Sequence, residues 1–296
     1  MILLGILAAR GGGITAGNFG YFAGGNGYDD IVDKFSFPSD TRSTLVAGLS
    51  VDRGQMPAGL SNSGVAGYVA GGYSPYLSSV DKFTFSSDSR STLGAGLTSG
   101  VYGTGGSSNF GVAGYVAGGQ ASGGSVSRID KFAFPGDSKS TLAATLSSSL
   151  AYVAGVSNSG TAGYFGGGLG SVSTVDKLNF STEAKSTLGT GLSSARFAVS
   201  GMANYNVAGY FGGGYGGSST VDKFTFSTDS RATLGTGLSV GGDAYSGANN
   251  AGVAGYYARN TVIDKFAFPT DTRSSLGTVL STSRNGGSSF SNEGSI

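Results

Sequence analysis

The chain has 296 residues, 56 of them glycine, and its 18 basic and 17 acidic side chains leave a formal net charge of +1. This balance provides no electrostatic basis for binding nucleic acid or inserting beside anionic lipid. Cysteine, histidine and tryptophan are absent, which excludes disulfides, the usual zinc, copper and haem sites, and any Ser-His or Cys-based nucleophile.

The chain begins with an apolar run, Met1 to Ala9 (MILLGILAA). The run is too short to cross a bilayer and lacks the basic start of a signal peptide. Because so much apolar surface is unfavourable in water, we expect it to be covered either by the flank of the repeat domain or by a partner chain. The position of the segment outside the repeats favours the partner chain. We therefore predict a docking segment over residues 1–12 and a separate domain over residues 13–296. The assembly contacts predicted in this segment are Ile2, Leu3, Leu4, Ile6 and Leu7.

A pattern of about 47 residues then recurs six times. Each copy contains a Gly-Tyr pair, whose tyrosines are Tyr21, Tyr68, Tyr115, Tyr164, Tyr210 and Tyr256. An Asp-Lys pair follows each of them, ending at Lys34, Lys82, Lys131, Lys177, Lys223 and Lys265. Such a period is typical of propellers and solenoids, whose repeats pack against one another to bury a shared core.

The fifth copy predicts four short strands. Ser194–Tyr205 mixes small and apolar residues, and Val207–Gly214 is an apolar run closed by glycines. Thr220–Phe226 alternates with a period of two, and Arg231–Leu238 is a fourth extended run. Turn-forming residues separate the four runs, and no apolar stripe supports a helix. The pattern predicts one four-stranded antiparallel blade per repeat.

Paired apolar residues on the third strand indicate how the blades pack. Phe224 and Phe226 lie two residues apart and therefore point to the same side of their strand. The corresponding pairs are Phe35/Phe37, Phe83/Phe85, Phe132/Phe134, Leu178/Phe180 and Phe266/Phe268. We expect each pair to fill the gap between adjacent blades.

The end of the chain supplies a strand that the first repeat lacks. Five repeats have an asparagine six residues before the tyrosine, at Asn62, Asn109, Asn158, Asn204 and Asn250. The first repeat has no such residue, but Ser291-Asn292 near the end resembles Ser61-Asn62. We predict that Ser283 to Asn292 is a displaced first strand that completes the first blade. Closing the ring in this way removes exposed sheet edges.

The order of strand, aromatic residue, glycine run, loop, alternating strand, turn and strand resembles the kelch repeat. The match lies in GYFGGG (Gly209–Gly214) and TVDKFTFSTD (Thr220–Asp229), and it recurs across residues 17–294. The usual kelch tryptophan before the last strand is missing, so the chain resembles a divergent branch. The sequence of these repeats is similar to kelch-like repeats in virion proteins of tailed phages, especially those of cyanobacteria. The N-terminal MILLGILAA also resembles the start of such phage proteins. The resemblance implies a six-bladed kelch-like β-propeller, an all-β fold.

The repeated charges have a structural explanation. The Asp-Lys pairs are expected to be solvated or blade-edge pairs that recur because the repeat was duplicated, and exposed ion pairs contribute little. A second set of acids occupies a turn, where they are expected to accept hydrogen bonds from turn amides. These acids are Asp40, Asp88, Asp137, Glu183, Asp229 and Asp271. Because the acids are spread around a ring and not paired in a cleft, we predict no catalytic residue and no hydrolase activity.

Three tyrosines outside the repeated pattern are the candidate ligand-binding residues. Tyr73 and Tyr76 lie in one long loop (GGYSPYLSS), and Tyr215 lies in the matching loop of the fifth repeat. Exposed aromatic rings can stack on sugars or anchor an interface. Simple packing within the loops is the alternative.

The preferred function is a non-enzymatic structural and binding module of a phage particle, in a tail, fibre or decoration role. Other virion proteins or further copies of the chain are the expected partners, together with a host-surface glycan. No cofactor, metal, nucleic acid or membrane insertion is expected, although a Ca²⁺ ion bound by loop oxygens stays open.

Two other function classes compete with this interpretation. One is a secreted or cell-surface carbohydrate-binding propeller of a bacterium, located outside the cell and not in a virion. The other is an enzyme, such as a sialidase or a propeller resembling galactose oxidase. The missing histidine and cysteine argue against the copper chemistry, and no arginine cluster or acid pair supports the sialidase.

Overall fold

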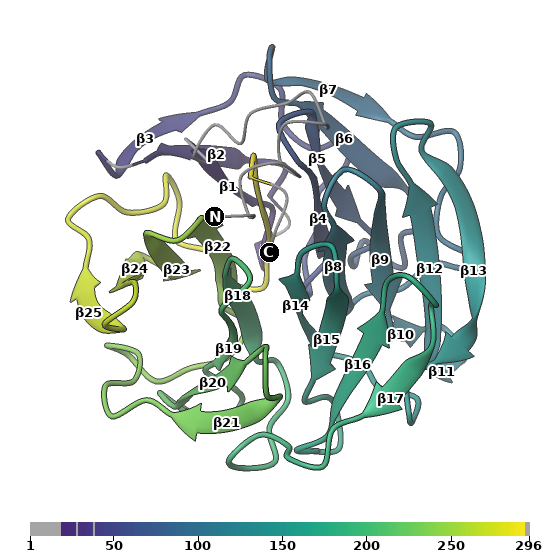
Figure 1. Ribbon diagram of the computed structural model, residues 1–296. Helices are drawn as coiled ribbons and strands as arrows, with labels where there is room; N and C mark the ends of the chain where they lie inside the picture. Colours follow the sequence, from purple (N-terminus) through teal and green to yellow (C-terminus); the bar gives the residue numbers. More distant parts are fainter. Residues whose placement is uncertain (1–18, 28, 38, 294–296) are drawn as a thin grey trace, which may run out of the picture.

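The computed structural model describes residues 19–27, 29–37 and 39–293, and these residues form a six-bladed β-propeller (Figure 1). Each blade is a four-stranded antiparallel sheet, and the innermost strands of neighbouring blades contact each other around the axis. The described ranges contain no helix, and so none long and apolar enough to span a membrane. The predicted all-β fold and blade number are confirmed.

The strands are numbered along the chain, and within each blade they follow one another from the axis outward. Blade 1 contains β26 (Ser288–Ser291), β1 (Phe19–Ala23), β2 (Val32–Ser36) and β3 (Thr41–Thr44). Blade 2 contains β4 (Ala58–Asn62), β5 (Ala66–Ala70), β6 (Val80–Thr84) and β7 (Ser89–Thr92). Blade 3 contains β8 (Gly105–Asn109), β9 (Ala113–Ala117), β12 (Arg128–Ala133) and β13 (Ser138–Thr145). A small hairpin, β10 (Gln120–Ala121) and β11 (Gly124–Ser125), lies between β9 and β12 in the sequence.

The remaining three blades follow the same order. Blade 4 contains β14 (Ala154–Asn158), β15 (Ala162–Gly166), β16 (Val175–Asn179) and β17 (Lys185–Thr187). Blade 5 contains β18 (Ser200–Asn204), β19 (Ala208–Gly212), β20 (Val221–Thr225) and β21 (Ser230–Thr233). Blade 6 contains β22 (Ser246–Asn250), β23 (Ala254–Arg259), β24 (Val262–Ala267) and β25 (Thr272–Ser275). The four strands predicted for the fifth repeat are present, although β21 ends earlier than the predicted Leu238.

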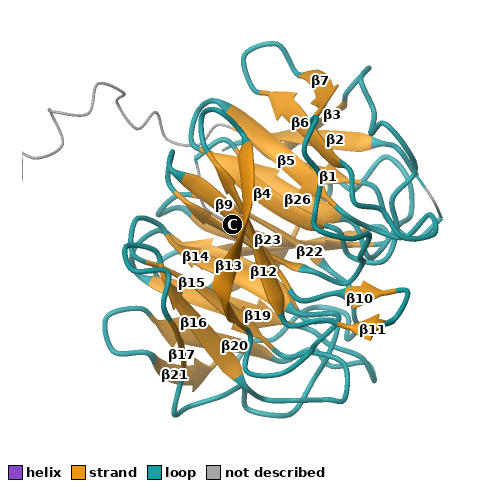
Figure 2. Cartoon of the chain, turned by 90° about the vertical axis from the view of Figure 1, so that its right-hand side faces the viewer, coloured by secondary structure: helices purple, strands orange, loops and turns teal. Residues whose placement is uncertain are grey.

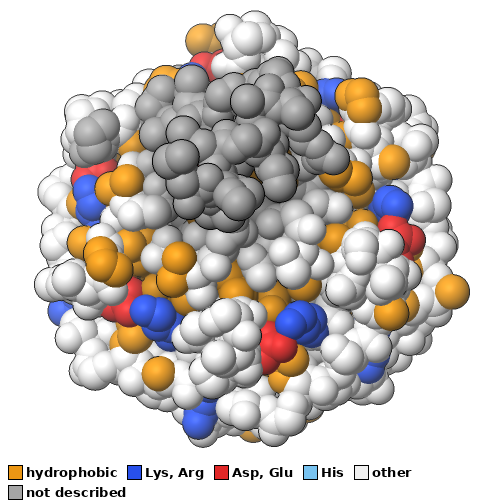
Figure 3. Space-filling model, viewed as in Figure 1, with side chains coloured by type: hydrophobic (Ala, Val, Ile, Leu, Met, Phe, Trp, Pro, Cys, Tyr) orange, Lys and Arg blue, Asp and Glu red, His pale blue; other side chains and the backbone are white. Residues whose placement is uncertain are grey.

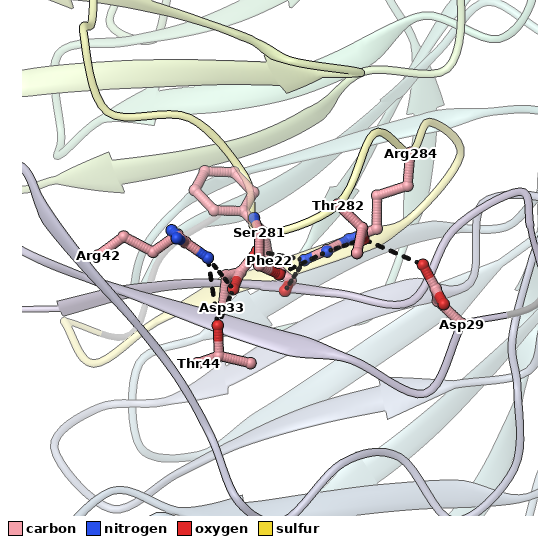
Figure 4. A network of polar contacts seen from close by, with 8 residues as sticks. All are labelled: Phe22, Asp29, Asp33, Arg42, Thr44, Ser281, Thr282 and Arg284. Atoms are coloured by element: carbon pink, nitrogen blue, oxygen red, sulfur yellow. Dashed lines mark hydrogen bonds and ion pairs between the residues drawn. The ribbon is translucent and has the colours of Figure 1, made fainter.

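The C-terminal strand closes the ring, as predicted. β26 pairs antiparallel with β1, placing Phe290 opposite Tyr21, and the two rings stack with centroids 4.8 Å apart. Just before this strand, the buried Arg284 donates from Nη2 to the Asp33 carboxylate at 2.9 Å and to the Phe22 carbonyl at 3.1 Å (Figure 4). Strands from the beginning and the end of the sequence therefore share one blade, and the ring has no free edge at its closing point.

Aromatic stacks join the blades at a larger radius. The second residue of each Phe pair lies on the tyrosine of the preceding blade, with centroids 4.7–5.5 Å apart. The six stacks are Tyr21–Phe85, Tyr68–Phe134, Tyr115–Phe180, Tyr164–Phe226, Tyr210–Phe268 and Tyr256–Phe37. The prediction that these residues fill the gaps between blades is confirmed.

The propeller has two different faces because successive strands reverse direction. The turn face carries the turns that join first to second strands and third to fourth strands. The loop face carries the loops between second and third strands and the connections from one blade to the next. Figure 2 views the disc from the side, where the β10–β11 hairpin projects from the loop face. The predicted docking segment, residues 1–12, lies outside the described residues, as do its side chains Ile2, Leu3, Leu4, Ile6 and Leu7.

Candidate functional site

On the turn face, the turn acids bridge neighbouring blades. Asp88 of blade 2 accepts a hydrogen bond from the Tyr21 hydroxyl at 2.9 Å and pairs with Lys34 at 2.7 Å, both from blade 1. The same arrangement recurs at every junction, ending where Tyr256 and Lys265 of blade 6 contact Asp40 of blade 1. Figure 3 shows basic and acidic side chains lying next to each other around this face. The turn acids thus act between blades, and in the described residues their partners are a tyrosine and a lysine of the neighbouring blade and not the turn amides that the sequence suggested.

These contacts also keep the tyrosines protonated. Burial raises the pKa of Tyr21 well above its usual range, and the Asp88 carboxylate raises it further because a tyrosinate would be repelled. The pKa is raised for the same two reasons in Tyr68, Tyr115, Tyr164, Tyr210 and Tyr256. The neutral hydroxyl is therefore a stable hydrogen-bond donor at each junction.

The aspartates of the Asp-Lys pairs are buried, so the prediction of a solvated pair is wrong for them. Asp81 has no exposed surface and accepts from the Ser50 amide, the Ser50 hydroxyl and the Thr92 hydroxyl at 2.7–2.9 Å. The buried Arg53 guanidinium adds an ion pair at 3.1 Å. Burial alone would raise the pKa of Asp81, but Arg53 and these hydrogen bonds outweigh it and hold the pKa below its usual range. Ser50 and Arg53 belong to the connection between blades, so Asp81 fastens that connection to its blade.

The two sets of repeated acids account for 12 of the chain's 17 acidic residues. Each is engaged in contacts that hold a blade, a connection or a junction together. Among the described residues, no group of three or more potential metal-ligating Asp or Glu side chains is present.

The axis of the propeller is closed on the loop face by a ring of backbone hydrogen bonds. The residue two positions before each inner strand has a positive φ, between 53° and 65°. The main-chain amide of this residue donates a hydrogen bond to a main-chain carbonyl in the preceding connection between blades, at 2.6–3.1 Å. The six hydrogen bonds form a complete circle around the axis. The donors are Met56, Gly103, Tyr152, Ala198, Ala244 and Gly286. The side chains of Met56, Ala198 and Ala244 form a buried apolar cluster at the same place.

Below that ring the inner strands approach one another so closely that little space is left. A Cβ atom on Gly106 would lie 2.1 Å from the Gly59 carbonyl oxygen of the neighbouring blade, which is closer than any side chain permits. The cavity that remains along the axis has a volume of only about 50 Å³. A propeller's central channel is a common place for a ligand, but here it is too small for more than a few water molecules.

The structure brings the three predicted ligand-binding tyrosines into one band on the loop face. The ring centroids of Tyr73 and Tyr76 are 5.7 Å apart. The Tyr102 centroid lies 5.2 Å from that of Tyr73 and 5.7 Å from that of Tyr76. The ring centroids of Tyr102 and Tyr152 are 5.8 Å apart. We call these four rings, together with Phe197 and Tyr215, the aromatic band.

The band continues from Tyr152 to blade 5. The Tyr152 and Phe197 centroids are 6.1 Å apart, and Phe197 stacks on Tyr215 at 4.7 Å. Tyr215 is 65% exposed and Tyr76 is 38% exposed, while the other four rings are half-buried. Six rings therefore form a continuous, partly exposed surface from the loop of blade 2 to the loop of blade 5.

Backbone pairing holds the band in place. The Tyr73 amide donates to the Gly54 carbonyl at 3.0 Å, and the Tyr215 amide donates to the Phe197 carbonyl at 3.0 Å. The Tyr152 hydroxyl donates to Gln55 Oε1 at 2.6 Å. These contacts fix the rings before any ligand arrives, which lowers the entropic cost of binding.

Sequence reasoning missed Tyr102, Tyr152 and Phe197. All three lie in connections between blades, at positions where the other repeats have different residues. Three positions before the inner strand, the residues are Gln55, Tyr102, Ala151, Phe197, Asp243 and Asn285. Aligning the repeats at these strands would have revealed the aromatic exceptions, although not their proximity.

The same comparison shows that the fold does not require these rings. Tyr152 occupies a positive-φ position that is alanine in two other blades, Ala198 and Ala244. Tyr73 and Tyr215 occupy the position directly after the glycine pair of their blades. In other blades this position holds residues such as Asn26 and Leu169. Because the backbone is the same with or without the ring, packing alone does not explain the aromatic band.

No family model matches the chain, and no curated protein matches it. Many solved structures do, among them one described as the structure of YjhT. That structure has a TM-score of 0.64 and 13% sequence identity, over 79% of this chain and 86% of YjhT. At this identity the similarity supports the propeller fold alone.

Proposed function

We propose that the protein is a non-enzymatic binding module of a phage particle, built on kelch-like repeats, and that the aromatic band is its binding surface. The observation that carries the binding role is the continuous band of six partly exposed rings at positions where the fold does not need them. Large rigid aromatic side chains are the residues on which binding surfaces most often depend.

Two observations support a role without catalysis. The repeated acids are occupied in contacts between and within blades, so few carboxylates remain to act as acid or base. The axial cavity of about 50 Å³ has no room for a substrate. Incubation with a panel of sialosides and other glycosides should give no turnover, and sustained turnover would overturn this part of the proposal.

The placement in a phage particle rests on the resemblance of the repeats to virion proteins, carried by GYFGGG and TVDKFTFSTD. In this proposal, residues 1–12 attach the propeller to other virion proteins or to further copies of the chain. A variant lacking residues 1–9 should fold but fail to assemble. If it assembles normally, attachment lies elsewhere; if it does not fold, the segment belongs to the core.

The second candidate is a secreted or surface-bound carbohydrate-binding propeller of a bacterium. The aromatic band favours this function equally, because tyrosines stack well on sugar rings. Mass spectrometry of purified virions separates the two candidates. Detection of the chain in stoichiometric amounts supports the virion role, and its absence from particles together with its presence in the culture medium supports the secreted protein.

A further inference from the structure

We propose that the aromatic band binds an extended, uncharged oligosaccharide, which lies across the loop face from Tyr76 past Tyr152 to Tyr215. This inference rests on the proposed function in one respect, namely that the band is the binding surface. It adds the chemical class of the ligand and the path that the ligand follows.

The spacing and exposure of the rings suit a chain of sugars. Neighbouring centroids from Tyr73 to Phe197 are 5.2–6.1 Å apart, and successive rings are inclined to one another by 59–86°. Phe197 and Tyr215 stack on each other with centroids 4.7 Å apart and end the band at blade 5. Both ends of the band are exposed, at Tyr76 and Tyr215, and the rings between them are half-buried. Sugar rings present apolar C–H faces that pack on aromatic rings, so a chain of sugars can contact several rings in succession.

Polar amide groups lie beside the rings. The Gln55 side chain accepts from the Tyr152 hydroxyl at 2.6 Å, and the Gln55 main-chain amide donates to Oδ1 of the exposed Asn26 at 3.1 Å. Asn285 lies next to Asn26, whose amide donates to the Asn285 carbonyl at 2.5 Å. Amide side chains both donate and accept hydrogen bonds, as sugar hydroxyls require. Gln55 lies beside the middle of the band, at Tyr152, and Asn26 and Asn285 continue from it towards blade 1.

The tyrosine hydroxyls complete this polar lining. Burial, followed by the neighbouring Tyr102, raises the pKa of Tyr152 to about 12. Burial also raises the pKa of Tyr102. The Tyr152 hydroxyl donates its proton to Gln55 Oε1, so it can only accept from a ligand, whereas the neutral Tyr102 hydroxyl can donate to a ligand oxygen.

The arginines near the band give no preference for an acidic ligand. Arg53 and Arg196 precede the band residues along the chain, but both are buried, and their guanidiniums pair with Asp81 at 3.1 Å and Asp222 at 2.5 Å. A third arginine on this face, Arg259, pairs with Asp243 at 3.3 Å. These cations are already neutralised, so they do not favour an acidic polysaccharide over a neutral one.

The loop face is also asymmetric around the axis. Blades 2 to 5 contribute aromatic residues, whereas the equivalent positions of blades 6 and 1 carry Asp243, Ala244, Asn285 and Gly286. The rings therefore form an elongated band and not a closed circle around the axis. An elongated surface fits a chain of sugars better than a single monosaccharide, because contact energy accumulates along its length.

Electrophoresis through gels that contain a soluble polysaccharide tests this inference. The probes are galactomannan, xyloglucan and dextran as neutral chains, and alginate and polygalacturonate as acidic chains. We expect at least one neutral polysaccharide to retard the full-length protein. Replacing Tyr102→Asn or Tyr152→Ala should weaken that retardation about tenfold, as expected for truncation of an aromatic anchor.

The chain offers matched controls. Asn285 and Ala198 are the residues of other blades at these two positions, so the variants should keep the melting temperature of the parent protein. Tyr205→Asn removes a half-buried tyrosine that contacts Phe110 on the turn face, and it should leave retardation unchanged.

Three results would overturn the inference: no retardation by any neutral polysaccharide, retardation by the acidic chains only, or full retardation of folded band variants. A band that binds a protein partner and no glycan would also overturn it, while leaving the virion role intact. Absence of the chain from purified particles would refute the virion role without affecting glycan binding, so the two failures are distinguishable.

Discussion

The two faces of the propeller differ in how similar the residues at equivalent positions of the six blades are. On the turn face every junction has the same three partners, a tyrosine, a lysine and an acid from the next blade. On the loop face the equivalent positions include Tyr102, Phe197, Asp243 and Asn285. Repetition thus identifies what holds the blades together, whereas departures from the repeat identify what the molecule can use for binding.

The physical reason is that each junction must satisfy the same geometry. A ring closes when the angles at its six junctions sum to a full turn, and identical contacts at every junction meet this condition. The loop face has no such constraint once the backbone ring through Met56, Tyr152 and Gly286 is made, because its bonds use main-chain atoms. Side chains at the positions just before the inner strands are therefore free to vary.

The turn face should respond most strongly to high pH. The six junction tyrosines have pKa values raised above the usual value of about 10 by burial and by the adjacent acids. A raised folded-state pKa gives stability that is fully present below pH ~10 and is lost as the pH rises further, because the unfolded state releases its protons first. A pH titration should show cooperative unfolding above this value, with tyrosinate absorbance rising together with the loss of β-structure. Ionisation of all tyrosines before unfolding would contradict the assigned contacts.

The next effect compares two buried aspartates, of which only Asp81 has a buried arginine as its partner. Asp81→Asn leaves the buried Arg53 without its counter-ion and should cost about 3–5 kcal/mol of the free energy of unfolding. Asp176→Asn should cost only about 1–2 kcal/mol, because Leu150 occupies the position equivalent to Arg53 and the ion pair that is lost is with the partly exposed Lys185, at 3.4 Å. Denaturant unfolding measures both values. Equal losses would show that the arginine is not important to the site.

A smaller effect tests whether the junctions are equivalent. Asp88→Asn and Asp229→Asn each remove the charge that receives one lysine and one tyrosine at a half-buried junction. Each should cost about 1 kcal/mol, and the two values should agree within about 0.5 kcal/mol. A large difference between them would break the claim that the turn face repeats energetically as well as structurally.

The band should contribute least to stability. Tyr102→Asn, which copies Asn285, should change the free energy of unfolding by less than about 1 kcal/mol, since the ring is half-buried and the backbone conformation already accepts asparagine. Chemical denaturation of this variant beside Asp81→Asn provides the contrast. A loss of several kcal/mol would assign the ring to the core and weaken the case for binding.

The features that repetition makes visible were predictable from the sequence. The period predicted the blades, and the resemblance of Ser291-Asn292 to Ser61-Asn62 located the strand β26 that completes blade 1. The burial of Asp81 was not predictable in the same way, because Ser50 and Arg53 approach it from a connection about 30 residues away. Charge alone suggested solvent exposure, whereas the fold supplies a buried set of donors.

The candidate site was predicted only in part. Tyr73, Tyr76 and Tyr215 were identified because they stand in loops, but Tyr102, Tyr152 and Phe197 join them only when four blades curve around the axis. Contacts between positions about 30 to 50 residues apart depend on the closed ring, which local patterns do not encode.

A single variant can exchange the band for the residues of other blades. It combines Tyr73→Asn, Tyr102→Asn, Tyr152→Ala and Tyr215→Asn, each copied from an equivalent position, and its melting temperature and its binding to the polysaccharide panel are measured together. We expect an almost unchanged melting temperature and complete loss of binding. Retained binding in a folded variant, or collapse of the fold, would contradict the claim that function lies where the blades differ.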